Sequence, residues 1–370
     1  MDEISRHEHW MRIALDEARK GVGRVEPNPP VGAVLVRDDE ELARGHHHKF
    51  GGPHAEVEAL TTATERGMDT AGATMYVTLE PCSHYGQTPP CVEAILKHDI
   101  ARVVASLEDP DSRVAGEGFG QLREAGVEVV CGPCREEARE LLNAYIKLRT
   151  KRRPWVIGKW AQTGDGALAL PDDAGRWISN DASRRDVHRI RGLCDGILVG
   201  SGTAIADDPL LTNRSGDGKQ PTRLVLDCRL RTPTDSRLAL SAHQAPVLIA
   251  TEETASATRL AHADALQRSG AELLALPCND DGIDLDALLD ELGRRQWTRL
   301  LVEGGAEVHR SFIQADLYDE LIVYVSPNDA PADRGLPRLH YRDVAERLSL
   351  GEPEEIDLDG DRRLRWVLRS

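Results

Sequence analysis

The chain has 370 residues, of which 40% are hydrophobic and 29% are charged, as in a globular protein with room for two domains. Its formal net charge of -16 argues against a nucleic-acid duplex as the main partner, because affinity for the phosphate backbone comes from clustered Lys and Arg side chains. A small phosphorylated substrate remains compatible with this charge, since it needs only a local basic pocket.

The sequence also bears on compartment and redox state. No apolar run approaches the ~18 residues of a membrane span, and the polar start MDEISRHEHW does not resemble a secretory signal. We therefore expect a cytoplasmic protein without a membrane partner. The seven cysteines are expected to be reduced thiols, some of them metal ligands.

The first 148 residues alternate helical and strand patterns, which predicts an α/β layered domain. Strands are expected over residues 31–37, 42–45, 73–79, 101–107 and 127–130, and helices over 4–21, 54–66, 90–97, 116–126 and 134–148. The Pro-rich segment EPNPPVG between the first helix and the first strand cannot lie inside a helix.

The basic run RTKRRP, residues 149–154, breaks this pattern, and we place a domain boundary there, between 1–148 and 149–370. The second half repeats the α/β alternation without sharing a motif with the first. Strands are expected over residues 155–161, 196–201, 222–227, 246–250, 271–276, 299–303 and 320–326, and helices near 181–192, 254–268, 284–294 and 306–315. The pattern indicates a fusion of two different α/β domains.

Residues typical of a zinc deaminase occur in the first half. His54-Ala55-Glu56 stands at a predicted helix start and is followed by Pro81-Cys82 and by Cys91. Zinc deaminases carry H-x-E and then P-C-x-x-C, because three ligands leave one zinc position for water and a separate carboxylate moves the protons. Eight residues rather than two separate the cysteines here, a loop that can return Cys91 to the next helix. The alternative is a helix start and a loop with incidental ligand-type residues.

Four stretches carry a resemblance to a known family: PNPPVGAVLV, PHAEVEAL, YVTLEPCSHYGQTPPC and ARVVASLEDPDSRVAGEG. They resemble the deaminase half of the bifunctional riboflavin-biosynthesis diaminohydroxyphosphoribosylaminopyrimidine deaminase/reductase family, which has the same eight-residue cysteine spacing. The resemblance implies a cytidine-deaminase-like fold with one Zn²⁺ on His54, Cys82 and Cys91. It implies Glu56 as the proton shuttle, and Asn28 and His47 as substrate contacts, although Asn28 between prolines is also typical of a simple turn.

The stretch GRWISNDASRRDVHRIRGLCDGILVGSGTAIADDPLLTNR resembles the reductase half of the same family, which resembles dihydrofolate reductase in fold and uses NADPH. The implied cofactor contacts are Ala161, Trp177, Thr203, Asp207, Cys228 and the stretch from Gly305. The implied substrate contacts are Gly175, Arg191, Leu211, Arg214 and Glu303.

Chemistry adds roles to several of these positions. Arg191 and Arg214 suit a ribose phosphate, Lys159 and Glu303 are expected beside the ribose carbon that receives hydride, and Asp207 is the leading candidate for an essential carboxylate. The alternatives are a turn at Asp207 and a solvated helix face at Arg191.

The sequence departs from the family at four places. Gln87 stands where a Lys or Arg is usual, and Asp109 to Ser112 reads DPDS rather than DPNP. Thr163 to Gly166 reads TGDG rather than SLDG, and NDAPADRG follows Pro327 where a Lys and a Gly-rich stretch are usual. Separately, the CGPC at residues 131–134 is read as a strand-to-helix turn with two incidental cysteines; a redox pair or second metal site is the alternative.

The sequence therefore predicts an enzyme that first deaminates a phosphorylated ribosylaminopyrimidine with zinc and then reduces its ribosyl group to a ribityl group with NADPH. A homodimer is expected from the family. One rival is an active deaminase with an inactive or repurposed reductase domain. Others are a nucleic-acid-editing deaminase, which the net charge and second domain disfavour, and a protein whose second half is a binding module or scaffold.

Overall fold

The structure, a computed structural model, describes residues 2–111, 115–171, 177–279, 282–330 and 335–368. The chain divides into two compact units, Met1–Arg152 and Arg153–Ser370. This division comes four residues later than the expected one (152 against 148), because helix α5 (Arg135–Lys151) extends into the basic run. Arg149 and Lys151 occupy its last turn, where positive charge is favourable at a helix C-terminus. Within the described ranges, no helix has the length and apolar character needed to cross a bilayer.

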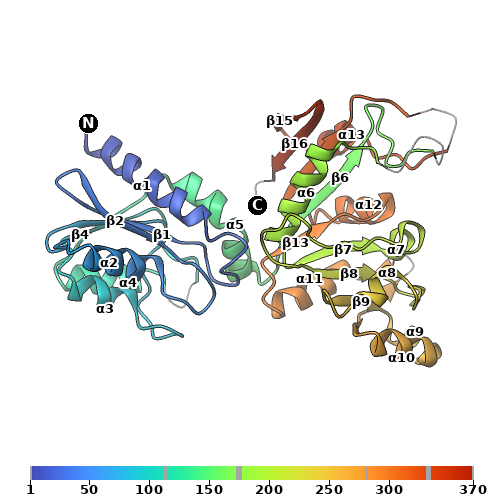
Figure 1. Cartoon of the computed structure of the whole chain (residues 1–370), viewed down its shortest axis with the longest axis horizontal. Helices are drawn as coiled ribbons and strands as arrows, with labels where there is room; N and C mark the ends of the chain where they lie inside the picture. Colours follow the sequence, from blue (N-terminus) through green and yellow to red (C-terminus); the bar gives the residue numbers. More distant parts are fainter. Residues whose placement is uncertain (1, 112–114, 172–176, 280–281, 331–334, 369–370) are drawn as a thin grey trace. The chain divides into compact units, whose positions relative to one another are not determined.

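The first unit is a five-stranded sheet between two layers of helices (Figure 1). Its sheet order is β2-β1-β3-β4-β5, with β1 antiparallel to both neighbours and β3, β4 and β5 parallel. The elements are α1 (Glu3–Arg19), β1 (Gly32–Arg37), β2 (Glu40–His46), α2 (Ala55–Glu65), β3 (Thr74–Val77), α3 (Cys91–Lys97), β4 (Arg102–Ala105), α4 (Glu117–Glu124), β5 (Glu128–Cys131) and α5.

Alternation along β1 creates the two hydrophobic cores of this unit. Ala33 and Leu35 pack with residues of α2, α3 and α4, whereas Val34 and Val36 pack with residues of α1 and α5. Successive side chains of a strand point to opposite faces, so one buried strand supplies both layers. Since β3 and β4 are parallel, the loops that follow them leave the same edge of the sheet, and this edge carries the candidate site.

A buried carboxylate joins these two loops. Glu80, in the loop after β3, accepts hydrogen bonds from four backbone N–H groups, those of Asp109 (3.1 Å), Gly116 (3.0 Å), Gly118 (2.9 Å) and Phe119 (3.2 Å). The last two belong to the first turn of α4, which otherwise leaves its N–H groups without partners. The Glu80 side chain therefore fixes the loop after β4 against the loop after β3.

The second unit contains a nine-stranded sheet, in the order β10-β9-β8-β7-β13-β6-β14-β16-β15, with helices packed on it (Figure 1). The strands from β10 to β14 are parallel, and β16 is antiparallel to both its neighbours. The strands are β6 (Trp155–Gln162), β7 (Gly196–Gly200), β8 (Thr222–Leu226), β9 (Val247–Thr251), β10 (Ala271–Ala275), β11 (Cys278–Asn279), β12 (Gly282–Ile283), β13 (Arg299–Val302), β14 (Glu320–Val325), β15 (Glu354–Leu358) and β16 (Asp361–Val367). The helices are α6 (Asp181–Leu193), α7 (Ser201–Asp207), α8 (Arg237–Leu240), α9 (Glu253–Thr258), α10 (Leu260–Arg268), α11 (Leu285–Arg294), α12 (Ala306–Gln314) and α13 (Tyr341–Arg347).

Every predicted strand of this half is present, but the prediction omitted several elements. The omitted elements are α7, α8, α13, the β11–β12 hairpin and the antiparallel strands β15 and β16, and the helix predicted over 254–268 is two helices, α9 and α10. In β16, buried Leu364 and Trp366 alternate with Arg363 and Arg365, a strand signal that the sequence reading overlooked. By contrast, α7 has the short sequence SGTAIAD, which has no helical apolar period.

The cysteines divide into a bonded pair and free thiols. Cys228, just after β8, forms a disulfide with Cys278 of β11, so the expectation of reduced thiols is wrong for this pair. The other five cysteines are free. Cys131 ends β5 and Cys134 caps α5, which is the predicted strand-to-helix turn. Burial raises the pKa of both thiols, which disfavours the reactive thiolate form there.

Glu80→Gln should lower the free energy of unfolding of the first unit by about 1–3 kcal/mol, because an amide has only one acceptor oxygen and leaves buried N–H groups without a partner. Differential scanning calorimetry would measure the change. Glu108→Gln, at an exposed position of the loop after β4 that Glu80 binds, removes the same charge and should change stability by less than about 0.5 kcal/mol. Equal stability of the two variants would contradict the role assigned to Glu80.

Candidate functional site

The three predicted zinc ligands come from separate segments and meet at the edge of the first sheet. His54 is the N-cap of α2, Cys82 lies in the loop after β3, and Cys91 is the first residue of α3. The His54 Nδ1 atom lies 3.4 Å from the Cys82 sulfur and 3.2 Å from the Cys91 sulfur. Ligand atoms around one tetrahedral zinc ion lie roughly 3.4–3.8 Å apart. This donor set therefore fits zinc, and within the described part of the chain it is a group close enough to hold a metal ion.

The eight-residue loop between the cysteines returns to the site as predicted. The backbone N–H of Cys91 donates to the Cys82 sulfur at 3.3 Å, and that of Val92 donates to the Cys82 carbonyl at 3.2 Å. Hydrogen bonds from Cys91 and then from His54 lower the pKa of Cys82 to about 4. The longer spacing of the cysteines thus changes the loop but preserves the ligand arrangement.

Glu56 lies beside the donor set without belonging to it. It is the second residue of α2, its side chain is buried, and it lines a cavity of about 440 Å³ that His54 and Cys82 also line. Burial raises the pKa of Glu56 to about 7. A carboxyl with a pKa near neutrality can both accept and release a proton under physiological conditions.

Asn28 and His47, the predicted substrate contacts, line the same cavity and contact each other. The Asn28 amide nitrogen lies 3.2 Å from His47 Nε2, and His47 Nδ1 lies 2.8 Å from the Pro53 carbonyl oxygen. Only a protonated Nδ1 can donate to that carbonyl, so Nε2 accepts from Asn28. Burial lowers the pKa of His47, which keeps its ring neutral. The pair presents a fixed polar edge to the cavity.

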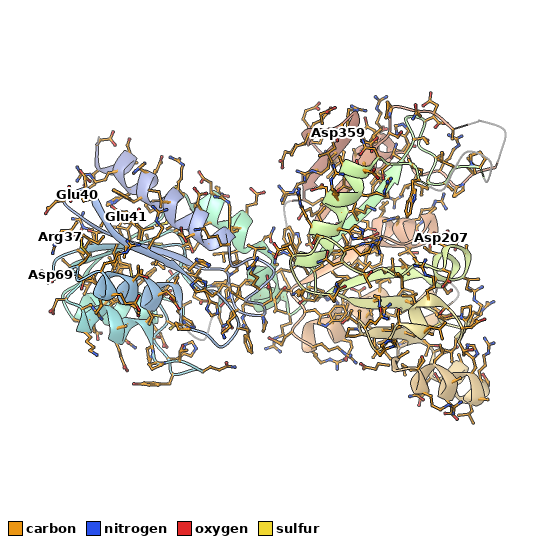
Figure 2. The ribbon with its side chains drawn as sticks, in the orientation of Figure 1. Arg37, Glu40, Glu41, Asp69, Asp207 and Asp359 are labelled. Atoms are coloured by element: carbon orange, nitrogen blue, oxygen red, sulfur yellow. A yellow bond between two sulfur atoms is a disulfide. The ribbon has the colours of Figure 1, made fainter. Side chains whose placement is uncertain are left out.

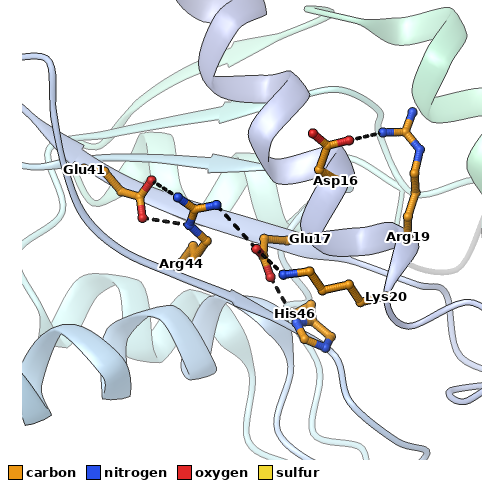
Figure 3. A network of polar contacts seen from close by, with 7 residues as sticks. All are labelled: Asp16, Glu17, Arg19, Lys20, Glu41, Arg44 and His46. Carbon is orange, nitrogen blue, oxygen red and sulfur yellow. Dashed lines mark hydrogen bonds and ion pairs between the residues drawn. The ribbon is translucent and has the colours of Figure 1, made fainter.

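A polar network joins α1 to the end of β2, directly before His47 (Figure 3). Glu17 of α1, whose side chain is 5% exposed, accepts from Lys20 at 2.6 Å and lies 3.2 Å from the ring of His46, at the end of β2. Arg44 of β2 lies 3.6 Å from Glu17 and pairs with Glu41 at 2.6 Å. His46 directly precedes His47, so this network anchors β2 to α1 next to the site. The sequence reading did not identify Glu17, which only the packing of α1 brings to β2.

Three predicted residues of the second unit also meet. Arg191 of α6 donates to both oxygens of Glu303, at 2.7 and 2.8 Å, and Lys159 of β6 lies 3.7 Å from the same carboxylate. All three side chains are buried, at 11%, 7% and 14% exposure respectively. Burial raises the pKa of Glu303, but the charges of Arg191 and Lys159 outweigh burial and bring it down to about 2. A carboxylate and two cationic side chains are therefore concentrated toward the carboxyl ends of β6 and β13.

The other predicted substrate contacts lie around Arg191. Its Nη1 atom donates to the Thr212 carbonyl at 3.1 Å, and the exposed Arg214 donates to the Thr212 hydroxyl at 3.2 Å. Leu211 is buried in a left-handed conformation, with φ of 52°. Because Arg191 is committed to Glu303 and Thr212, Arg214 is the better-placed of the two arginines to bind a phosphate.

His188 belongs to this group and was missed in the sequence. Its Nδ1 accepts from the Arg214 backbone N–H at 3.2 Å. Burial, followed by the charges of Arg191 and Arg214, lowers the pKa of His188 to about 4, so the ring is neutral. The available signal was its position three residues before Arg191, which places both on one face of α6.

Two glycine-rich turns approach each other at the carboxyl ends of the neighbouring strands β7 and β13. A Cβ atom on Gly304 would lie 2.4 Å from the Cα of Val199, and one on Gly305 would lie 2.9 Å from the Thr203 hydroxyl. Gly305 is the N-cap of α12, whose first N–H groups are available to an anion. Such a position at the ends of parallel strands is where α/β sheets bind nucleotides, so the turns fit a dinucleotide phosphate. Ala161 lies near the same end of β6.

The remaining predicted contacts differ in exposure and in bonding. Asp207 is the last residue of α7 and its side chain is exposed (Figure 2). Trp177 is 57% exposed and lies under the guanidinium of Arg184. The sulfur of Cys228 is bonded to Cys278 and is not a free thiol. Gly175 lies outside the described residues.

The two departures in the reductase half contact each other. Gly164 donates to the Asn328 carbonyl at 2.9 Å, and Asp165 accepts from the Ala330 N–H at 3.0 Å. A Cβ atom on Gly164 would lie 2.6 Å from the carboxylate of Asp329. The unusual segment after Pro327 thus occupies space that a larger residue at position 164 would need.

Comparisons with known proteins agree with both sites. Residues 4–107 match the model of the cytidine and deoxycytidylate deaminase zinc-binding region, and residues 154–328 match the RibD C-terminal domain. The riboflavin biosynthesis protein RibD of Aquifex aeolicus is 38% identical over 354 residues, covering 95% of this chain and 96% of the relative.

Solved structures give the same result over the full chain. RibD of Acinetobacter baumannii is 35% identical with a TM-score of 0.84, and both chains are covered completely. A Thermotoga maritima structure described as a diaminohydroxyphosphoribosylaminopyrimidine deaminase/5-amino-6-(5-phosphoribosylamino)uracil reductase is 33% identical with a TM-score of 0.84, again with complete coverage of both. A zinc-binding deaminase domain joined to a RibD-type reductase domain makes this chain a member of the RibD family of riboflavin biosynthesis proteins.

Proposed function

We propose that the chain catalyses two consecutive steps of riboflavin biosynthesis. Residues 1–152 deaminate 2,5-diamino-6-(5-phosphoribosylamino)pyrimidin-4(3H)-one, and residues 153–370 reduce the ribosyl group of the product to a ribityl group with NADPH. The observation that carries this proposal is the buried Glu56 carboxyl beside a His54, Cys82, Cys91 donor set in one cavity. The Lys159–Glu303–Arg191 cluster supports a functioning second domain.

In the deaminase site, a zinc ion held by His54, Cys82 and Cys91 supplies Lewis-acid activation of water at neutral pH. Glu56 carries the two protons of the attacking water in turn, one to the ring nitrogen and the other to the departing ammonia. Asn28 hydrogen-bonds the edge of the pyrimidine and fixes its orientation toward Glu56, while the neutral His47 accepts from the Asn28 amide and holds it in place.

In the reductase site, opening the ribosyl ring requires hydride at its first carbon and a proton on the ring oxygen. NADPH supplies the hydride when bound against the turns at Thr203 and Gly305, with Ala161 and Trp177 as further contacts. Burial lowers the pKa of Lys159, so its ammonium is a proton donor held in place by Glu303. Arg214 binds the phosphate, and Arg191 orients Glu303.

Homodimerisation and a cytoplasmic location complete the proposal. Light scattering of the purified chain tests the first. An assay of NADPH oxidation with the diaminopyrimidine ribotide, followed by chromatography of the products, tests the whole reaction. Ribitylated uracil with loss of NADPH supports both activities. Accumulated deaminated ribosyl product with NADPH unchanged would instead favour an active deaminase with an inactive or repurposed reductase domain.

Glu56→Gln should keep zinc and lose deamination by a factor of about 10²–10⁴, because the amide cannot move a proton. Ammonia release and zinc content by atomic absorption measure the two properties. Near-normal turnover would refute the shuttle role.

Cys82→Ser should lose the metal, because a hydroxyl is a far weaker zinc ligand than a thiolate. The zinc content per chain, measured after gel filtration, is expected to fall well below that of the unmodified protein. Cys131→Ser changes an exposed thiol outside the site and should retain zinc. Equal zinc in both variants would remove Cys82 from the ligand set.

Asp207→Asn should spare deamination and slow reduction by about 10²-fold or more, because the substitution removes the predicted essential carboxylate of the reductase site. Ammonia release and NADPH oxidation separate the two steps. Asp359→Asn, at an 80% exposed side chain of the same unit (Figure 2), is the matched control. Reduction rates that are equal in the two variants would leave Glu303 and Lys159 as the essential polar groups.

A further inference from the structure

The deaminase cavity is lined by acidic groups and one strongly basic side chain. Among the described residues that line it, the carboxyl groups belong to Glu56, Glu80, Asp109 and Asp111, and Arg149 is the one Arg or Lys. The loop between the two cysteines contributes the neutral Gln87 to the wall. A doubly charged phosphate entering this cavity would be repelled by the carboxylates unless a cation met it.

Two of these acids are stabilised without Arg149. Glu80 accepts from four backbone N–H groups of the loop after β4 and the start of α4. Asp109 accepts from the Tyr145 hydroxyl, 3.2 Å from each carboxylate oxygen, and from the Asp111 N–H at 2.8 Å. Neither carboxylate uses the guanidinium, so the charge of Arg149 is not consumed by this acidic wall.

An aromatic ring rather than a carboxylate holds the Arg149 side chain. Its guanidinium carbon lies 5.1 Å from the centre of the Tyr145 ring, one turn earlier on α5. The Nε atom is buried and has no hydrogen-bond partner within the part of the chain described. An aromatic face beside a guanidinium restricts its movement but does not use the N–H donors that lie in the guanidinium plane. These donors can bind two phosphate oxygens at once.

We infer that Arg149 binds the phosphate group of the deaminase substrate and so selects the phosphorylated ribosylaminopyrimidine over its dephosphorylated counterpart. Tyr145 positions Arg149, and Asp109 in turn holds Tyr145. This inference rests on the proposed deaminase function of the same cavity and adds the residue that recognises the anionic end of the substrate.

The test compares Arg149→Gln with the unmodified full-length, zinc-loaded enzyme, using the phosphorylated substrate and the corresponding nucleoside. For the phosphorylated substrate, KM should rise about 10- to 100-fold, the range of one charged hydrogen bond, with kcat within about 3-fold. The KM for the nucleoside should stay within about 2-fold, because it lacks the phosphate. Arg149→Lys keeps the positive charge but lacks the planar guanidinium. Its KM for the phosphorylated substrate should therefore lie between those of the unmodified enzyme and Arg149→Gln.

Arg139→Gln removes the same charge from an exposed position of α5 and should leave both KM values unchanged. An equal rise in KM for both substrates in Arg149→Gln would show a structural role and overturn the inference, as would an unchanged KM for the phosphorylated substrate.

Binding of ribose 5-phosphate, followed by isothermal titration calorimetry, separates this inference from the proposed function. The unmodified protein should bind ribose 5-phosphate at the first unit, and Arg149→Gln should weaken that binding about 10-fold or more, whereas uncharged ribose should not distinguish them. Retention of this difference in an enzyme that deaminates neither substrate would refute the proposed reaction and leave the anion site standing. If the enzyme deaminates its substrate but the unmodified protein and Arg149→Gln bind ribose 5-phosphate equally well, only the assignment of Arg149 as the phosphate site is overturned.

Discussion

The deaminase site depends on the hydrogen bonds that the buried Glu80 carboxylate accepts. Glu80 stands two residues before Cys82. Its carboxylate accepts hydrogen bonds from four backbone N–H groups of the loop after β4 and the start of α4. One of these belongs to Asp109, whose carboxylate meets the Tyr145 hydroxyl, and Tyr145 in turn supports Arg149. A single acid thus connects the segment of a predicted zinc ligand to the far wall of the cavity. Hydrogen bonds from four N–H groups also explain how this carboxylate can be buried with no cationic partner among the described residues.

The buried acids Glu80, Asp195 and Glu303 differ in what binds them. Glu80 is bound by backbone N–H groups, whereas Asp195 accepts from the Thr298 and Arg299 N–H groups and also from the Lys219 ammonium at 2.6 Å, and joins the starts of β7 and β13. Glu303, by contrast, is bound by the side chains of Arg191 and Lys159 at the carboxyl ends of the strands. Backbone-bound carboxylates stabilise the scaffold, because their partners cannot move away. Glu303 and its two cationic partners instead concentrate charged groups at the strand ends, where a substrate can use them.

The two sequence departures of the reductase half become one feature in the structure. Thr163 to Gly166 lies against the segment that follows Pro327, through Gly164–Asn328 and Asp165–Ala330 hydrogen bonds. Asp165 also pairs with Arg338, which strengthens the same contact. The absence of a side chain at Gly164 leaves room for Asp329 of that segment. Lys159, Arg191 and Glu303 of the same unit are paired with one another.

The sequence alone determined the α/β alternation, the zinc donor set with its long cysteine spacing, and the family, because these depend on periodicity and on motifs of nearby residues. It did not reveal the Glu80 contacts, the neutral His188, the Cys228–Cys278 bond or the position of Arg149 over Tyr145 in the cavity wall. It named both Asp207 and Glu303, but only the structure shows that Asp207 is exposed and that Glu303 is paired with Arg191, 112 residues away in the chain. Such contacts follow from strand order and helix packing, and only the tertiary structure decides which distant side chains meet.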